Sequence, residues 1–373
     1  MEKDIYQRLA QHLDNLPGGF PPTETGVELR VLRRLFSPAE AELALHLTLI
    51  PEEPRVIARR AKISREDAVQ RLEQMATKGL IFRVQPEGGR PQYQALQYLI
   101  GIWEFHVNDL DKELVQDMDE YLPTLSKEAW KLPQLRTVPV GRSITARMEI
   151  LPHEKAEELV RGQEKFAVAP CICRREQKMI GKGCQKQEET CLVFGMAADY
   201  YIRNGLGRTI DLQETINILR KADEEGLVLQ PSNTQEIMNI CCCCGDCCGV
   251  FRILKTFPKP ASQVVSPFVV SNRTETCEGC GLCVERCQMG ALSLANEKAT
   301  LNLDRCIGCG LCVSTCPTDS LTLTRKPDSD QPIVPKDIIK AAISRGQKRG
   351  KLGPAKLVQM QLKSKVDRLL AAR

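Results

Sequence analysis

Residues 35–97 show three helical patterns followed by a strand–turn–strand pattern. Ser37-Pro38-Ala39-Glu40 supplies an N-cap residue, a proline for the first helical position and an acid behind it. A second helix is predicted over 54–61, and a third begins at Ser64, where apolar residues recur near helical spacing as far as Leu80. Residues 81–85 and 92–96 flank a turn with two glycines, which predicts a β-hairpin.

The order of three helices and a hairpin resembles a winged helix-turn-helix. This resemblance implies a winged-helix-like domain over residues 35–100. Residues 1–34 are polar with a Pro/Gly-rich break and are predicted to form an N-terminal extension, whereas residues 101–135 are predicted to form an acidic helical linker. The remaining chain divides into a mixed cysteine-rich region (136–265), a compact strand–turn region (266–325) and a helical tail (326–373).

Cysteine is the unusual component of this chain, with 18 residues against 4 histidines. The N-terminus shows no signal peptide, and no apolar run reaches the roughly 18 residues of a membrane span. The sequence therefore predicts a cytoplasmic protein, in which clustered cysteines hold metal rather than form disulfides. The tail from Lys326 carries twelve Lys or Arg against four Asp or Glu. Such a tail is typical of a solvated helix, and it can also meet nucleic acid, an acidic partner or a membrane surface.

An internal repeat marks residues 277–316. The run Cys277-Glu-Gly-Cys280-Gly-Leu-Cys283-Val-Glu-Arg-Cys287 recurs 29 residues later as Cys306-Ile-Gly-Cys309-Gly-Leu-Cys312-Val-Ser-Thr-Cys316. Soft thiolate ligands suit iron–sulfur clusters, and three cysteines at this spacing can wrap one cube. A zinc ribbon is the alternative, but it normally uses two separated Cys-x-x-Cys pairs and fits two four-cysteine runs poorly.

The repeat resembles the bacterial two-cluster ferredoxins, in which the fourth cysteine of each run binds the other cluster. The resemblance implies one [4Fe–4S] cluster on Cys277, Cys280, Cys283 and Cys316, and another on Cys306, Cys309, Cys312 and Cys287. The runs 291–294 and 321–323 are expected to be short strands that cover the clusters. Gln288 departs from the family pattern, which has proline after this cysteine. The predicted fold class is thus α+β multidomain, with a winged-helix-like domain, a cysteine-rich middle region, a ferredoxin-like domain and a basic helical tail.

Two further cysteine groups lie upstream of the repeat. The first is interleaved with cations and is a candidate for a third cluster: Cys171, Cys173, Cys184 and Cys191. The second places six thiols in eight residues, of which at most four are expected to ligate, with help from the first group: Cys241, Cys242, Cys243, Cys244, Cys247 and Cys248. Structural zinc remains an alternative for 171–248, and free buried cysteines are a second alternative for the first group. This stretch resembles a cysteine-rich region found beside ferredoxin domains in proteins of anaerobic bacteria and archaea, a family with no assigned reaction.

These features predict an iron–sulfur electron-transfer protein, a carrier or subunit that exchanges low-potential electrons with a partner oxidoreductase. No nucleotide-binding or nucleophile motif indicates a catalytic site of its own. Two alternatives stay open. One is a redox-responsive winged-helix regulator, although Glu66, Asp67 and Glu73 on its presumed recognition helix would repel DNA phosphates. The other is an iron–sulfur reductase with a substrate site within 171–248.

Overall fold

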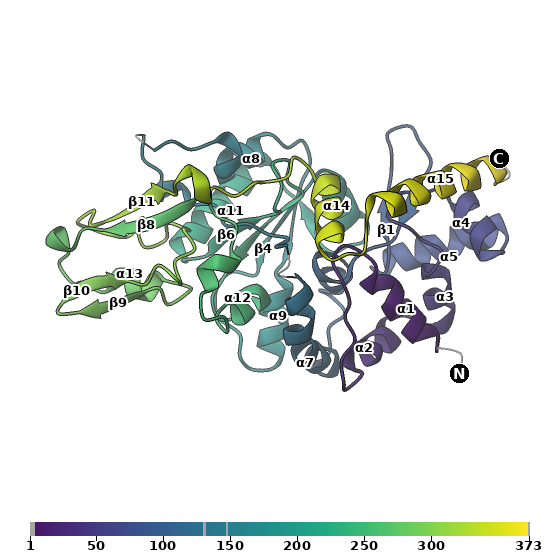
Figure 1. The fold of residues 1–373 in the computed structure, drawn as a ribbon, viewed down its shortest axis with the longest axis horizontal. Helices are drawn as coiled ribbons and strands as arrows, with labels where there is room; N and C mark the ends of the chain where they lie inside the picture. The colour runs from purple at the N-terminus through teal and green to yellow at the C-terminus, as the bar shows by residue number, and fades with distance from the viewer. Residues whose placement is uncertain (1–3, 130–131, 147, 372–373) are drawn as a thin grey trace. The chain divides into compact units, whose positions relative to one another are not determined.

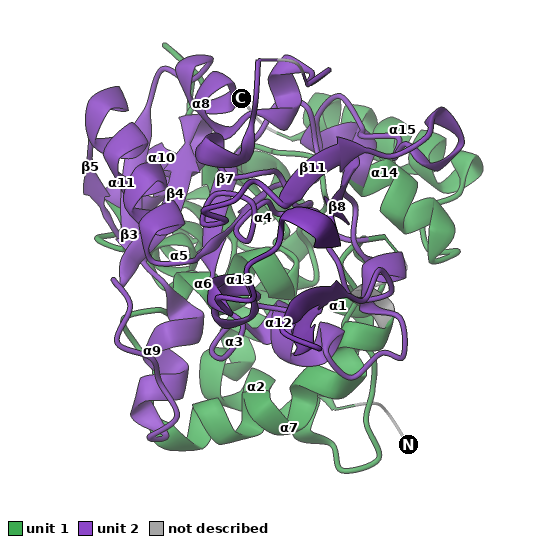
Figure 2. Cartoon of the chain, turned by 90° about the vertical axis from the view of Figure 1, so that its left-hand side faces the viewer, with its two compact units in different colours: residues 1–132, 203–206, 342–373 green, residues 133–202, 207–341 purple. Residues whose placement is uncertain are grey.

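The computed structural model describes residues 4–129, 132–146 and 148–371, and these form two compact units (Figure 2). Unit 1 contains residues 1–132, 203–206 and 342–373, and unit 2 contains 133–202 and 207–341. The segments predicted from the sequence are finer than these units, and their boundaries stay predictions. Trp130, Lys131 and Ala372, which fall in predicted helical stretches, lie outside the described residues.

Unit 1 is mainly helical. Its helices are α1 (Ile5–Asp14), α2 (Val27–Leu35), α3 (Pro38–Ala44), α4 (Pro54–Ala61), α5 (Arg65–Thr77), α6 (Trp103–Phe105), α7 (Lys112–Ala129) and α15 (Pro354–Leu370). α1 and α2 occupy the segment predicted as a polar extension, because Tyr6, Leu9 and Leu13 form a buried face that the sequence prediction overlooked. The predicted linker helix is interrupted: α7 begins only after Asp111, whose carboxylate accepts the N–H of Leu114 at 2.9 Å.

The three helices and the hairpin lie where the sequence predicts them. Ser37 caps α3 and accepts the N–H of Glu40, and Ser64 caps α5 and accepts the N–H of Asp67. Strands β1 (Phe82–Val84) and β2 (Gln92–Gln94) pair antiparallel. The assignment of this segment to the winged-helix class stays a prediction.

The basic C-terminal helix is attached to unit 1 by buried charges. Asp367 of α15 accepts Arg60 at 2.6 Å and Arg59 at 2.5 Å, and Arg60 also pairs with Glu52 at 2.5 Å. The hydroxyl of Ser364 donates to Glu52 at 2.6 Å. Glu52 and Asp367 are buried and the side chain of Arg60 is only 7% exposed, so breaking one pair would leave an uncompensated charge in the interior. Among the described helices, none combines the length and apolarity that a bilayer crossing requires.

His12 of α1 should make unit 1 sensitive to acid. Its Nε2 atom is buried without a hydrogen-bond partner in the described structure, and burial, followed by the charges of His46 and Lys356, lowers the pKa to about 4. Between pH 6.5 and 4 the unfolded chain binds a proton that the folded chain rejects, so falling pH favours unfolding by about 1 kcal/mol per pH unit. Burial also lowers the pKa of His46 and His106, so urea unfolding followed by tryptophan fluorescence should show a smaller slope in His12→Gln than in the wild type, by about this amount. An unchanged slope in the variant would assign the acid sensitivity to another group.

Unit 2 is built on a five-stranded antiparallel sheet with the order β5-β3-β4-β7-β6. The strands are β3 (Phe166–Pro170), β4 (Glu189–Phe194), β5 (Arg208–Thr209), β6 (Val228–Pro231) and β7 (Asn239–Cys243). The helices along this part are α8 (Ala156–Arg161), α9 (Ile172–Met179), α10 (Gly195–Arg203), α11 (Leu212–Glu224) and α12 (Gly249–Leu254). The register places Cys191 of β4 opposite Cys241 of β7. The central strands therefore bring cysteines from both upstream groups next to each other.

The predicted ferredoxin-like region contains two strand pairs and the short helix α13 (Leu282–Arg286) (Figure 1). β8 (Phe268–Asn272) pairs with β11 (Leu321–Arg325), and β9 (Leu292–Ala295) pairs with β10 (Lys298–Leu301), both antiparallel. The expected strands at 291–294 and 321–323 are present as β9 and β11, and each begins within one residue of its predicted start. Apolar residues of these strands pack with buried cysteines of the repeat, including Leu292, Leu321 and Leu323. The chain then continues into α14 (Ile338–Lys348).

Candidate metal centres

The first cavity of the repeat, here called cage 1, is lined by Cys277, Cys280, Cys283 and Cys316. The first three cysteines come from one loop and the start of α13, whereas Cys316 comes from the end of the second run, 33 positions after Cys283. Cys280 is exposed, while Cys277 and Cys283 are buried. The structure thus gathers the four side chains that the ferredoxin resemblance assigns to one cluster.

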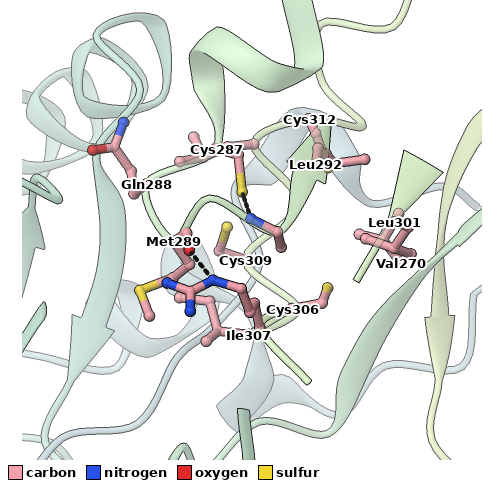
Figure 3. A pocket seen from close by; sticks show the side chains of 14 residues that line it. Val270, Cys287, Gln288, Met289, Leu292, Leu301, Cys306, Ile307, Cys309 and Cys312 are labelled. Carbon is pink, nitrogen blue, oxygen red and sulfur yellow. Dashed lines mark hydrogen bonds between the residues drawn. The ribbon is translucent and has the colours of Figure 1, made fainter. Parts of the chain in front are cut away.

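The second cavity, here called cage 2, is lined by Cys306, Cys309, Cys312 and Cys287 (Figure 3). Its fourth cysteine follows α13, because one helical turn after Cys283 carries the chain away from cage 1. Apolar side chains such as Val270, Leu292 and Leu301 complete the lining. The two cages are therefore reciprocal, since each receives its fourth thiol from the other run.

Backbone N–H groups point at the cage thiols. The N–H of Ala291 donates to Cys287 Sγ at 3.1 Å, and that of Ala299 donates to Cys277 Sγ at 3.3 Å. Such bonds stabilise the negative charge of a thiolate and are one way in which proteins tune iron–sulfur sites. The donor set of each cage, four thiols supported by N–H donors in an apolar lining, fits a [4Fe–4S] cluster.

Two glycines let the loops pass close to neighbouring backbone, the turn between β9 and β10 and the strand β8. Gly279 and Gly308 occupy equivalent positions of the repeat and have φ of 71° and 67°, in the left-handed region that favours glycine. A Cβ at Gly279 would lie 2.1 Å from the carbonyl oxygen of Glu297, and one at Gly308 would lie 2.1 Å from that of Phe268. A side chain at either position would push the loop away from this backbone and distort the cage.

The surroundings of the cage cysteines raise the pKa of some and lower that of others. Burial raises the pKa of Cys309 to about 12. Burial also opposes ionisation of Cys316, but hydrogen bonds from the Ser320 hydroxyl and from nearby backbone N–H groups overcome it and lower the pKa to about 7. The pKa of Cys277 is lowered, first by the N–H of Ala299. In cage 1, Cys277 and Cys316 thus ionise more readily than an ordinary thiol, which favours metal binding, whereas burial raises the pKa of Cys283.

The comparison with known families decides the class of this region. Residues 276–320 match the 4Fe-4S dicluster domain. This domain carries two [4Fe–4S] clusters, in agreement with the two four-cysteine cages. No curated protein and no solved structure matches the chain. The family match covers the repeat alone, and the assignment of individual cysteines to each cluster stays a prediction that the cage geometry supports.

In the structure, the upstream cysteines form two groups whose members differ from those of the two groups in the sequence. The first, here called the thiol row, is Cys171, Cys173, Cys248, Cys243 and Cys241. Hydrogen bonds link Cys173 to Cys171 and to Cys248, and link Cys243 to Cys248 and to Cys241. Cys191 lies opposite Cys241 in the sheet. Cys242 is buried on the opposite face of β7, because side chains alternate along a strand.

The second group, here called the 184/247 site, is Cys184, Cys244, Asp246 and Cys247. Their ligand atoms all lie within 4.8 Å of one another, and no other group of three or more such side chains in the described ranges is as tight. The structure therefore separates Cys184 from Cys171 and Cys173, with which the sequence grouped it. Asp246 was not predicted as a ligand, although its place inside a Cys-x-x-Cys turn could have suggested it.

A buried arginine, also unassigned by the sequence, lies beside both groups. Arg174 of α9 has no exposed surface, and its guanidinium donates to the Thr190 hydroxyl and to the carbonyl oxygen of Cys242. Burial alone would lower its pKa, but negative charge on the neighbouring Cys171, Cys244, Cys243 and Cys184 raises it. The cysteine-rich region therefore surrounds a fixed positive charge with thiols.

Proposed function

We propose that this chain is an iron–sulfur electron-transfer protein, a carrier or subunit that exchanges electrons with a partner oxidoreductase. The reciprocal pair of four-cysteine cages carries this proposal. When bound, [4Fe–4S] clusters accept and donate single electrons. Since every iron of each cube would have its own cysteine, no iron is left open to a substrate. This arrangement suits electron transfer rather than bond chemistry.

Cage 1 offers the more accessible route for electrons. Cys280 is exposed, and Leu282 and Leu294, which also line this cage, are 44% and 46% exposed. An apolar surface beside a cluster lets a partner approach closely and exclude water. Cage 2, by contrast, has no exposed cysteine, because Cys306 and Cys312 are buried and Cys287 and Cys309 are half-buried. We therefore place the partner's docking surface at cage 1.

Titration under anaerobic conditions tests this function. The purified chain should take up about two electrons from dithionite, one per cluster, with bleaching of its visible absorption. The reduced protein, freed of dithionite, should then pass the same number to oxidised methyl viologen and stop. Sustained turnover of a reductant and an acceptor would instead indicate an enzyme. A chain that neither bleaches nor reoxidises would refute electron transfer.

The regulator alternative has less support. On α4, Arg59 and Arg60 are paired with Asp367, and on α5, Glu66 is exposed beside the Asp67–Arg71 pair. Cations that are already paired have little charge left for phosphates, and the exposed acid would repel them. A salt-dependent mobility shift with duplex DNA would revive this alternative.

The reductase alternative requires a substrate to reach the thiols of 171–248. Cys242, Cys243, Cys244, Cys247 and Cys248 are buried, and the thiol row is bonded within itself. This packing favours metal ligation or a structural role over an open substrate site.

A further inference from the structure

The geometry points to a zinc ion bound by Cys184, Cys244, Cys247 and Asp246, a mononuclear site distinct from the two clusters. Three thiols and one carboxylate supply the four ligands of a tetrahedral site. The inference does not depend on electron transfer, because zinc has no redox chemistry of its own. Its failure and that of the proposed function can therefore be told apart.

The spacing of the ligand atoms favours a single ion over a cube. Cys184 Sγ and Cys244 Sγ lie 3.8 Å apart, and all four ligand atoms fall within 4.8 Å. Zn–S bonds of about 2.3 Å in a tetrahedron separate neighbouring sulfurs by about 3.8 Å. The thiols of cages 1 and 2, by contrast, are spread around cavities, as the four irons of a cube require. Among divalent ions that thiolates bind, zinc is held more tightly than iron.

The backbone of the site is already fixed by bonds to its surroundings. The N–H of Cys184 donates to Cys247 Sγ at 3.4 Å, and the N–H of Cys247 donates to Asp246 Oδ1 at 3.0 Å. Gly245 donates its N–H to Gln288 Oε1 at 2.6 Å, and its carbonyl accepts Lys255 Nζ at 2.6 Å. These contacts hold the Cys-x-x-Cys turn in place before any ion binds, which lowers the cost of ordering it.

The buried positive charge of Arg174 also favours ionised thiols in this region. Arg174 is fully buried, its Nε has no hydrogen-bond partner, and no ion pair to a carboxylate is seen for it among the described residues. A guanidinium without a counter-charge is costly to bury. Three thiolates and one carboxylate on a divalent zinc leave two net negative charges, and these offset the arginine. Negative charge on Cys171 and Cys243 of the thiol row acts on the same arginine.

Gln288 connects this site to cage 2. It follows Cys287, where the ferredoxin pattern has proline, and its side chain bonds to the turn that carries Cys244 and Cys247. A Cβ at Gly245 would lie 2.4 Å from the carbonyl oxygen of Gln288, so the two segments are in close contact. The departure from the family pattern therefore supplies the contact that joins the zinc turn to the dicluster domain.

Metal analysis of the full chain tests the inference. Anaerobically purified protein should hold about one zinc besides the iron. Cys184→Ala should lower zinc at least about tenfold and leave iron unchanged, whereas the matched control Cys242→Ala, on the other face of β7, should keep both. The proposal would be overturned if Cys184→Ala kept its zinc. It would also be overturned if the wild type held no zinc and Cys184→Ala lost iron.

X-ray absorption at the zinc edge decides the case if the Cys184→Ala variant fails to fold. The unmodified protein should show about three sulfurs near 2.3 Å and one oxygen near 2.0 Å. Asp246→Ala should replace that oxygen by water and speed zinc loss to a chelator, with circular dichroism unchanged. A shell of four sulfurs, or an absent zinc signal, would refute the site.

Discussion

Cys316→Ala is expected to empty cage 1 although Cys316 belongs to the second cysteine run. Iron should fall from about eight to about four per chain, because one iron of the first cube would lose its thiolate while cage 2 keeps all four. Iron and sulfide analysis of anaerobically purified protein measures this loss. Cys287→Ala should empty cage 2 by the same reasoning.

Double variants separate reciprocal ligation from ligation within one run. Cys316→Ala combined with Cys280→Ala should lose no more iron than either alone, since both thiols line cage 1. Cys316→Ala combined with Cys309→Ala should lose nearly all of it, because Cys309 lines cage 2. If the Cys316→Ala/Cys309→Ala variant, with both changes in the second run, instead kept four irons, each run would hold its own cluster. Cys242→Ala, with a buried thiol outside both cages, is the control for loss of a cysteine.

The dicluster region could be predicted from the sequence because its ligands are set by local spacing. Three of the four thiols in each cage lie within seven residues, so the loop alone brings them together, as at Cys277, Cys280 and Cys283. The fourth could be named only through the ferredoxin resemblance. The bonds of Ser320 and the N–H of Ala299 to the cage thiols depend on strand packing, and spacing could not reveal them.

The middle region could not be predicted in the same way. Cys184 and Cys247 are separated by 62 intervening residues, and only the folded sheet and its loops bring them within reach. Arg174 looked like one cation among several in its segment, yet packing buries it completely. In unit 1, caps and hairpin signals located α3, α5 and the β1–β2 pair, whereas α1 was missed because its apolar face is short and embedded among polar residues.

Gly308→Ala is expected to abolish the second cluster while leaving the first. The new methyl would meet the carbonyl oxygen of Phe268 in β8 at 2.1 Å, and this oxygen belongs to backbone that cannot turn aside as a side chain would. The left-handed φ of 67° adds strain of about 1 kcal/mol. The loop that presents Cys306 and Cys309 would have to move away, and cage 2 would open.

Gly290→Ala is the matched control for that substitution. Gly290 has a similar φ of 61°, but a Cβ there would meet nothing within 4 Å. This variant should therefore lose only about 1 kcal/mol of unfolding free energy and keep about eight irons. Gly308→Ala should lose about 3 kcal/mol more than the control, the usual upper range for overpacking, and about four irons. Equal iron contents and equal stabilities in the two variants would show that the loop does not pack on Phe268.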